Sequence, residues 1–347
     1  MRPLKFKPVN IGTIWGSEDW ILSAMEGRQT VCISEGPDSG KTLSELIDTY
    51  KEELVGGKGW KAFGTRFPLL VKYINSNQQL SVQVHPDDAM AKKRNLPNGK
   101  SEMWYVLEAK EDSELLIGFS KRFSPEEFEA IVRNSIQEKD VLKGEKTLED
   151  VLNRFRPARG DWYFIPAGTV HSIGAGTRIL EIQQPSDTTY RLYDFNRVDI
   201  EGKKRHLDIE DAIQAIDFTE TQEKTVEQQR NVSDYIAAQG GKDTAKSSLM
   251  TIPLVSCKHF SVSVMDFSDT ERDGGFPFIY NHDYSATGSF SILVCTAGAG
   301  KLFYSAIGSC IKESLPIENG DLFLLPAELG AVQIQSTKAL QLVEAHI

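Results

Sequence analysis

The sequence predicts a mainly β protein with two β domains and a helical insert in the first of them. The chain has 347 residues, more than one hydrophobic core usually organises. Short apolar runs separated by turn residues, which are typical of β-strands, dominate both ends of the chain. The residues between these ends, 219–248, are polar and poor in large apolar side chains. We therefore expect one domain at 1–218 and a second at 249–347, joined by this polar linker.

The N-terminal part of the chain predicts outer strands, one helix and a buried strand. Two strand-like runs, ILSAM and TVCIS, come first. Thr42 and Glu45 then form the pattern of a capping box, which begins a helix over residues 43–50. The overlapping GPDSGKT is one residue too short for a phosphate-binding G-x-x-x-x-G-K-T loop, so we expect no nucleotide site there. Residues 67–74 are a continuous apolar run, as in a buried strand.

Polar side chains alternate along the next two predicted strands. Side chains in a strand repeat every two residues, so Ser81, Gln83 and His85 share one face. After a Pro-Asn-Gly turn signal, Lys100 and Glu102 share one face of the following strand. An ordinary amphipathic hairpin with a solvent-exposed face has the same pattern, so this strand pair alone does not establish a site.

A helical insert is predicted at about 124–156, between two β segments. Ser124, Pro125 and Glu127 are a helix-start signature, and Thr147 begins a second predicted helix. Such an insert would wall a substrate cleft or serve as a purely structural cap. The apolar residues at helical spacing are Phe128, Ile131, Val132 and Ile136 in the first helix, and Leu148, Val151, Leu152 and Phe155 in the second.

The segment GDWYFIPAGTVH predicts an apolar strand, a Pro-Gly turn and a returning strand that begins with His171. This arrangement aims the imidazole inward. A lone histidine is more often structural than a ligand. Here, however, the two-residue alternation of the predicted strands allows Gln83, His85 and Glu102 to face the same side as His171. Two imidazoles, a carboxylate and an amide oxygen, with one position open to water, suit a divalent ion such as Zn²⁺.

A second polar centre follows in QPSDTTYRLYDFNR, where Asp187 lies four residues before Arg191. A charged strand surface with an arginine is usually solvated, so this segment alone does not establish a site. Asp208 then predicts the cap of a short helix that ends near residue 216.

The chain from about residue 250 onward alternates short apolar runs with turns and predicts a second β-barrel. Its GDLFLLPAELGA repeats the earlier GDWYFIPAGTVH, with Gly320, Asp321 and Pro326 at matching positions. Ala331 stands at the position of His171. We therefore expect a degenerate copy that cannot bind a metal in the same way.

The segment that ends at His171 resembles the second signature of the cupin superfamily. The Gln-x-His strand followed by Lys-x-Glu-Met resembles type I phosphomannose isomerases, where other cupins carry His-x-His and a glutamate. The Ser-Asp-x-x-x-Arg element that ends at Arg191 is similar to a further element of that family. The resemblance covers most of residues 10–216 and, more weakly, the C-terminal barrel. It implies two cupin-type jelly-roll barrels, of which the second is degenerate.

This resemblance implies the reversible conversion of mannose 6-phosphate into fructose 6-phosphate with one zinc ion per chain. It makes Arg191 and Lys100 the expected catalytic cations, and it places Ser81 and Asp187 beside the substrate. The zinc ligands that it implies are Gln83, His85, Glu102 and His171.

The residues themselves allow such chemistry. A metal ion near the carbonyl and hydroxyl oxygens of a sugar would acidify the C–H beside the carbonyl, and proton transfer between C1 and C2 through an enediolate interconverts aldose and ketose. Which group is the base stays open. Two other functions also fit: a cupin dioxygenase that holds Fe²⁺, and a sugar-binding module without turnover. Gln83, Lys100 and Arg191 argue against the dioxygenase.

The composition narrows the expected partners and location. A net charge of −10 and a pI near 5.3 argue against nucleic acid or an anionic membrane as a partner. No run approaches the roughly 20 apolar residues of a membrane span. A small sugar phosphate is the expected partner, and the oligomeric state is open. The start has no apolar core of a signal peptide, and scattered cysteines indicate free thiols in the cytoplasm: Cys32, Cys257, Cys295 and Cys310.

Overall fold

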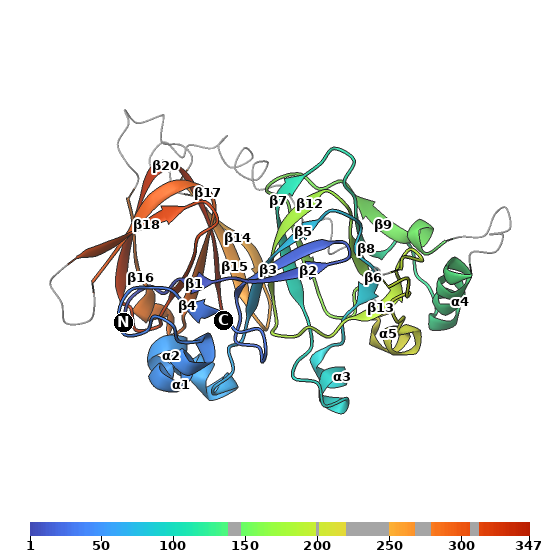
Figure 1. Ribbon diagram of the computed structural model, residues 1–347, viewed down its shortest axis with the longest axis horizontal. Coiled ribbons are helices and arrows are strands. Elements are labelled where there is room, and N and C mark those ends of the chain that lie inside the picture. The colour runs from blue at the N-terminus through green and yellow to red at the C-terminus, as the bar shows by residue number, and fades with distance from the viewer. Residues whose placement is uncertain (138–146, 199–200, 220–249, 268–278, 306–311) are drawn as a thin grey trace. The chain divides into compact units, whose positions relative to one another are not determined.

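The computed structural model describes residues 1–137, 147–198, 201–219, 250–267, 279–305 and 312–347 (Figure 1). The described residues are mainly β, as predicted, and form three sheets of five to seven strands and one sheet of two strands. The predicted linker at 219–248 lies outside the described residues from 220 onward, and so does Cys310. Among the described residues, no helix has both the length and the apolar character needed to cross a membrane.

Residue contacts divide the described chain into two compact units. The first unit draws on Met1–Val9, Trp20–Val71 and Asp234–Ile347, and the second on Asn10–Asp19 and Lys72–Ser233. This grouping differs from the predicted domain at 1–218, because residues 20–71 group with the C-terminal strands. Backbone hydrogen bonds give the physical reason. Ala327 N–H donates to Leu54 O at 3.0 Å, and Leu4 and Leu324 exchange two hydrogen bonds of 2.9 and 2.8 Å.

Two antiparallel sheets carry the predicted site in the second unit. The six-stranded sheet has the order β10-β7-β12-β5-β3-β2, and the five-stranded sheet has the order β13-β6-β11-β8-β9. The six strands are β2 (Val9–Thr13), β3 (Gly16–Leu22), β5 (Leu70–Ser76), β7 (Glu102–Ala109), β10 (Trp162–Ile165) and β12 (Thr177–Gln183). The five are β6 (Val82–Val84), β8 (Leu115–Phe119), β9 (Leu152–Phe155), β11 (His171–Ile173) and β13 (Tyr190–Tyr193).

Strand alternation decides which side chains of β6 reach the site. Val82 and Val84 are fully buried in an apolar cluster with Phe128 and Val132 of a neighbouring helix. Burying such side chains stabilises the fold by about 1.5–3 kcal/mol each. Gln83 points to the opposite face of the strand, as the two-residue period predicts. The apolar packing on one face therefore fixes the polar face on the other.

Three helices flank these sheets: α3 (Asp88–Lys93), α4 (Pro125–Ile136) and α5 (Ile209–Ala215). The predicted start of α4 is confirmed, because Ser124 and Glu127 form a reciprocal capping box. Helix α3, which Asp87 caps, was not predicted. Asp208 precedes α5 but makes no side-chain cap; its carboxylate accepts a hydrogen bond from Arg191 N–H instead, at 3.0 Å.

The second helix predicted in the insert is wrong. Residues Leu148–Val151 form one 3₁₀ turn, η1, and Leu152–Phe155 are strand β9. Strand β9 pairs with β8, with Leu152 opposite Phe119 and Phe155 opposite Leu115. An available strand edge thus outweighs the helical spacing of these apolar residues.

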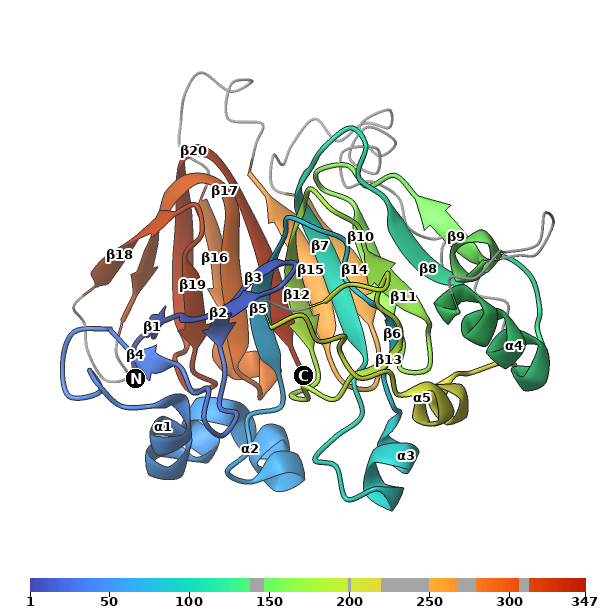
Figure 2. The same cartoon turned by 45° about the vertical axis from the view of Figure 1, so that its right-hand side comes forward.

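The first unit contains a seven-stranded sheet, in which β14-β15-β20-β17-β18 are neighbours, β16 pairs with β20, and β19 pairs with β17 (Figure 2). The predicted helix at 43–50 is confirmed as α1 (Leu43–Tyr50), with its Thr42–Glu45 capping box, and the unpredicted α2 (Glu52–Phe63) follows. The short strands β1 (Phe6–Lys7) and β4 (Val31–Cys32) pair with each other. The sheet strands are β14 (Met250–Ser256), β15 (Ser261–Asp266), β16 (Ile279–Asp283), β17 (Ser291–Tyr304), β18 (Glu313–Glu318), β19 (Leu322–Leu325) and β20 (Ala331–His346), with the 3₁₀ turn η2 (Tyr284–Thr287).

The sequence repeat is also a structural repeat. Asp161 and Asp321 stabilise their turns in the same way, because each carboxylate accepts a hydrogen bond from the backbone N–H three residues earlier. The Asp161 carboxylate accepts from Ala158 N–H at 2.7 Å, and the Asp321 carboxylate accepts from Glu318 N–H at 2.9 Å. The glycine before each aspartate has a left-handed φ, 88° at Gly160 and 93° at Gly320. The two segments are therefore equivalent structural elements, one in each unit.

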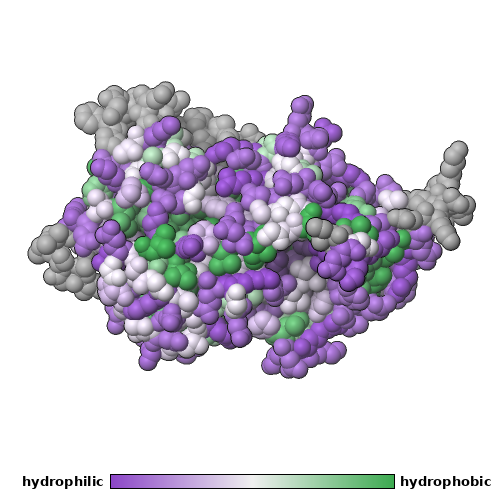
Figure 3. All heavy atoms as spheres, in the orientation of Figure 1, coloured by the Kyte–Doolittle hydropathy of each residue, from purple (hydrophilic) through white to green (hydrophobic). Residues whose placement is uncertain are grey.

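The face shown in Figure 3 is mainly polar, with apolar side chains in small groups. The exposed large hydrophobic residues among those described are Ile14, Ile33, Val198 and Ile279.

Candidate metal centre

The structure brings His85, Glu102 and His171 together in one buried cluster. One ligand-capable atom from each residue lies within 4.8 Å of the others, and each residue is 1% exposed. Glu102 Oε2 lies 3.4 Å from His85 Nε2, and Glu102 Oε1 lies 3.5 Å from His171 Nε2. His85 follows strand β6, Glu102 begins β7, and His171 begins β11. Three strands from two sheets thus converge on this point.

Backbone carbonyls fix the tautomers of both histidines. His85 Nδ1 donates to Thr188 O at 2.9 Å, and His171 Nδ1 donates to Thr169 O at 2.8 Å. A carbonyl only accepts, so the proton is on Nδ1 and each Nε2 presents its lone pair to the cluster. Burial lowers the pKa of His171, and burial together with the charge of Lys100 lowers the pKa of His85 to about 3. Both rings are therefore neutral, as metal ligands must be.

Glu102 carries the negative charge of the cluster. Burial alone would raise the pKa of this carboxyl, but the charge of Lys100 holds the pKa well below its usual range. Lys100 Nζ lies 2.8 Å from Glu102 Oε2 and 3.0 Å from His85 Nε2. The Trp104 indole N–H donates to Glu102 Oε1 at 3.0 Å. The carboxylate is thus ionised and oriented by two neighbours.

Gln83 reaches the same cluster through its amide. Gln83 Nε2 lies 3.3 Å from His171 Nε2, and Gln83 Oε1 accepts from the Ser81 hydroxyl at 3.1 Å. The amide nitrogen therefore faces the histidine lone pair, whereas ligation through oxygen requires the amide to turn over. Strand pairing sets this proximity, because Gln83 and His171 are opposite each other in the β6–β11 ladder.

A tight turn delivers Lys100 to the cluster. Lys100 N–H donates to Pro86 O at 3.0 Å, and Gly99 N–H donates to Asp88 Oδ1 at 3.1 Å. A Cβ atom on Gly99 would lie 2.6 Å from the Asp87 carbonyl carbon. The Pro-Asn-Gly signal thus marks a close backbone approach that only glycine allows.

Sequence reasoning missed a second set of buried charges beside the cluster. Lys72 Nζ lies 3.2 Å from Glu18 Oε2 and 3.1 Å from Glu181 Oε1. Burial would lower the pKa of Lys72, but the two carboxylates raise it above its ordinary value, whereas burial and the Glu102 charge raise the pKa of Glu181. The available signal was the occurrence of Lys72 and Glu181 inside otherwise apolar strands, where charged residues are rarely buried without partners.

A cavity of about 280 Å³ adjoins these charges. It contains four of the predicted site residues in its lining, namely Ser81, Gln83, Lys100 and Arg191. Asp187 is exposed on the loop between β12 and β13 and is not among the lining residues. The other polar residues of the lining are Thr13, Glu18, Lys72, Glu181, Thr189 and Arg205.

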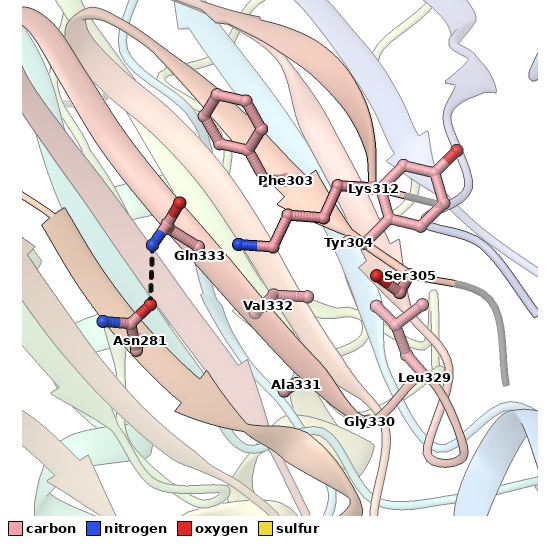
Figure 4. A pocket seen from close by; sticks show the side chains of 10 residues that line it. All are labelled: Asn281, Phe303, Tyr304, Ser305, Lys312, Leu329, Gly330, Ala331, Val332 and Gln333. Carbon is pink, nitrogen blue, oxygen red and sulfur yellow. Dashed lines mark hydrogen bonds between the residues drawn. The ribbon is translucent and has the colours of Figure 1, made fainter. Parts of the chain in front are cut away.

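The first unit also has a cavity, of about 310 Å³, but its lining residues are of different types (Figure 4). Ala331, which matches His171 in the repeat, lines this cavity. Asn281 and Gln333 are joined by a hydrogen bond of 2.9 Å on its wall. The described lining contains no histidine, aspartate or glutamate. We therefore place the candidate site in the smaller, charged cavity of the second unit.

Comparison with known proteins identifies the family. Residues 16–122 match the family model described as phosphomannose isomerase type I, catalytic domain. The chain is 31% identical over 351 residues to mannose-6-phosphate isomerase ManA of Bacillus subtilis, and this alignment covers 96% of both chains. It is also 31% identical over 330 residues to a mannose-6-phosphate isomerase of Streptococcus mutans, covering 95% of this chain and 88% of the relative.

Solved structures agree with these sequence matches. The crystal structure of the Bacillus subtilis mannose 6-phosphate isomerase superposes with a TM-score of 0.78 at 26% identity, covering 100% of both chains. A mannose 6-phosphate isomerase solved in a zinc-bound form matches with a TM-score of 0.69 at 14% identity, covering 100% of this chain and 99% of the other. The expected fold of two cupin-type jelly-roll barrels with a helical insert is confirmed. The near full-length matches above 30% identity show that this chain belongs to the type I phosphomannose isomerase family.

Proposed function

We propose that this protein is a zinc-dependent isomerase that interconverts mannose 6-phosphate and fructose 6-phosphate. The observation that carries the proposal is the buried cluster of His85, Glu102 and His171 beside a cavity lined by lysine and arginine. Family membership supports the reaction, because the full-length relatives are named mannose-6-phosphate isomerases.

The donor set fits one zinc ion. Two neutral imidazoles, each with an unprotonated Nε2, and one ionised carboxylate are the usual protein ligands of catalytic zinc. Glu102 Oε2 is buried and lies 2.8 Å from Lys100 Nζ and 3.4 Å from His85 Nε2. Gln83 is the fourth proposed ligand, through its amide oxygen. When bound, the ion would act as a Lewis acid that polarises sugar oxygens. A solved structure of similar fold also holds zinc.

The chain supplies the other requirements of an aldose–ketose isomerisation. In this reaction a proton moves from C2 to C1, or back, while the carbonyl changes place between these carbons. Lys100 and Arg191 are the proposed catalytic cations, since both line the cavity and can face negative charge on the substrate or the intermediate. Ser81 is the proposed contact of a sugar hydroxyl. The role of Asp187 beside the substrate stays a prediction.

The same geometry bears on the two other functions considered from the sequence. A facial-triad dioxygenase also uses two histidines and one carboxylate. Such an enzyme has no evident need for the buried Lys72 and Lys100, or for Arg191, in its cavity. A sugar-binding module would need the cations but not the metal cluster. The isomerase uses both the cations and the metal cluster.

We also propose a cytoplasmic location, since Cys32, Cys257 and Cys295 form no disulfide.

The test is an assay that couples fructose 6-phosphate formation to a reporter enzyme, with mannose 6-phosphate as substrate. The protein is assayed as purified, after chelation, and after zinc is restored. We expect activity to disappear on chelation and to return with zinc. Absence of turnover in zinc-loaded protein would contradict the proposal, and oxygen consumption with Fe²⁺ would favour the dioxygenase.

A further inference from the structure

Two arginines, Arg191 and Arg205, line the same cavity as the candidate metal cluster. Arg191 lies on strand β13, and Arg205 lies between β13 and α5. Burial lowers the pKa of Arg191, and the charge of Arg205 lowers it further. The two guanidinium groups repel each other, and the carboxylates of Asp194 and Asp208 offset part of this repulsion.

The Arg191 guanidinium group, which lines the cavity, has one N–H donor without a partner among the described residues. Its Nε is buried and has no hydrogen-bond acceptor among the described residues. Its Nη1 donates to His206 O at 3.1 Å, which anchors one branch of the guanidinium group. A buried donor without a partner is costly, so its retention indicates a ligand that the donor serves.

Arg205 is held rigidly by one carboxylate. Its Nε donates to Asp194 Oδ2 at 2.7 Å, and its Nη2 donates to Asp194 Oδ1 at 2.5 Å. This bidentate fork uses Nε and Nη2 but not Nη1, and the described residues provide no acceptor for Nη1. Arg197 also pairs with Asp194. The carboxylate of Asp194 is thus shared between two arginines and cannot fully neutralise both.

The turn after Asp194 is strained. Phe195 and Asn196 both have left-handed φ angles, of 53° and 52°. The Phe195 ring packs against Tyr193 at 5.1 Å between centroids, and the Arg197 guanidinium lies 5.4 Å from the Phe195 ring centroid. Strained backbone of this kind concentrates at functional sites, where surrounding contacts maintain it. Here the strained turn fixes Asp194, and through it Arg205.

The cavity's two lysines are paired with carboxylates: Lys72 with Glu18 and Glu181, and Lys100 with Glu102. Among the described residues, the guanidinium N–H groups of the cavity that have no acceptor include Arg191 Nε and Arg205 Nη1. A phosphate group offers two negative charges and several acceptor oxygens, which match the remaining N–H groups of two guanidinium forks.

We propose that Arg205, together with Arg191, binds the phosphate group of the substrate, and that Asp194 is the positioning residue that aims Arg205 into the cavity. This assignment rests on the proposed sugar-phosphate function and extends it to the residue that holds the phosphate. Arg205 was not predicted as a site residue, because its place in the cavity lining depends on the fold of the whole segment between β13 and α5.

The experiment uses the zinc-loaded, full-length chain and two readouts. Calorimetric titration with inorganic phosphate measures the anion site directly, and steady-state kinetics with mannose 6-phosphate give KM and kcat separately. In Arg205→Ala we expect phosphate affinity to fall and KM to rise, each by about 10-fold to 100-fold, the usual effect of losing a charge-assisted contact. kcat should change much less. Arg205→Lys, which keeps the charge but loses the fork, should lie between wild type and Arg205→Ala.

Lys204→Ala is the matched control. It removes one positive charge at the adjacent residue, whose ammonium contacts Asn196 and does not line the cavity. We expect its phosphate affinity and KM to stay within about twofold of wild type. Melting temperature and zinc content are compared for all variants, and Arg205→Lys replaces Arg205→Ala if the latter does not fold.

The outcomes separate this inference from the proposed function. Phosphate binding that weakens in the Arg205 variants supports the inference, even if wild type shows no isomerase turnover, in which case the proposed function alone fails. The inference would be overturned by a phosphate affinity and a KM that are unchanged in folded Arg205→Ala, or by an equal loss of affinity and an equal rise in KM in Lys204→Ala. Neither outcome would bear on whether the protein is an isomerase.

Discussion

Glu102 and Glu181 share one hydrogen-bond donor, the indole N–H of Trp104, at 3.0 and 3.2 Å. The two glutamates lie on adjacent strands β7 and β12, and Glu181 is directly opposite Trp104 in the ladder. Two buried carboxylates that bind the same N–H group lie close together and repel each other. Trp104, Lys72 and Lys100 offset this repulsion, and they keep Glu102 ionised and turned toward the two histidines.

Trp104→Phe tests this orientation. The change keeps an aromatic ring but removes the N–H that holds Glu102, so zinc affinity should fall by about 10-fold to 100-fold, as for other groups that orient metal ligands. Competition with a chromophoric zinc chelator measures the affinity. Trp60→Phe in helix α2 is the control, because Trp60 lies outside the cluster. Equal zinc affinity in Trp104→Phe and wild type would show that the indole does not support the ligand.

Lys72→Met tests the neighbouring charge network. Removal of the ammonium leaves Glu18 and Glu181 without their shared cation, and breaking a buried ion pair in this way costs about 3–5 kcal/mol of unfolding free energy. Urea unfolding of the metal-free protein measures the loss. Lys41→Met is the control, since Lys41 and Asp38 form a partly exposed pair whose loss should cost less than about 1 kcal/mol. Similar losses in both variants would argue against the network.

Asp194 should make folding sensitive to acid. Burial raises the pKa of its carboxyl, but hydrogen bonds from Arg205 and Arg197 outweigh burial and lower the pKa below the usual value. The unfolded chain then binds the proton first as pH falls, so the stabilisation is complete above about pH 4 and is lost as pH falls through the lower folded-state pKa.

The difference in unfolding free energy between wild type and Asp194→Asn reports this contribution. The difference should be constant from neutral pH down to the unfolded-state pKa and should shrink at more acidic pH. Other acid-sensitive groups are common to both proteins and cancel in the comparison. A difference that does not vary with pH would show that Asp194 does not titrate in this range.

The sequence predicted the parts of the fold that depend on local patterns. The capping boxes at Thr42 and Ser124 began helices where expected. Strand alternation brought Gln83 and His85 toward Glu102, and the repeated Gly-Asp-strand-Pro segments proved equivalent in their hydrogen bonds. Helix α3 was not predicted, although Asp87 is a recognisable cap, since Ala91 is the one buried residue among its six.

Other features were not predictable because they depend on tertiary pairing. Residues Leu152–Phe155 have helical spacing but form a strand, since the edge of β8 is available to them. Lys72 and Glu181 are far apart in the chain, and only the pairing of their strands within one sheet makes them an ion pair. Arg205 likewise becomes a cavity residue through Asp194, eleven residues earlier.

The most direct test of the central claim is a zinc titration of the chelated protein, with bound zinc and mannose 6-phosphate turnover recorded in the same samples. We predict that turnover rises with bound zinc and saturates at one ion per chain, and that His171→Ala loses both. His282→Ala, which changes a histidine of the C-terminal sheet, should match wild type. Turnover that is independent of zinc, or full zinc binding and turnover in His171→Ala, would contradict the account.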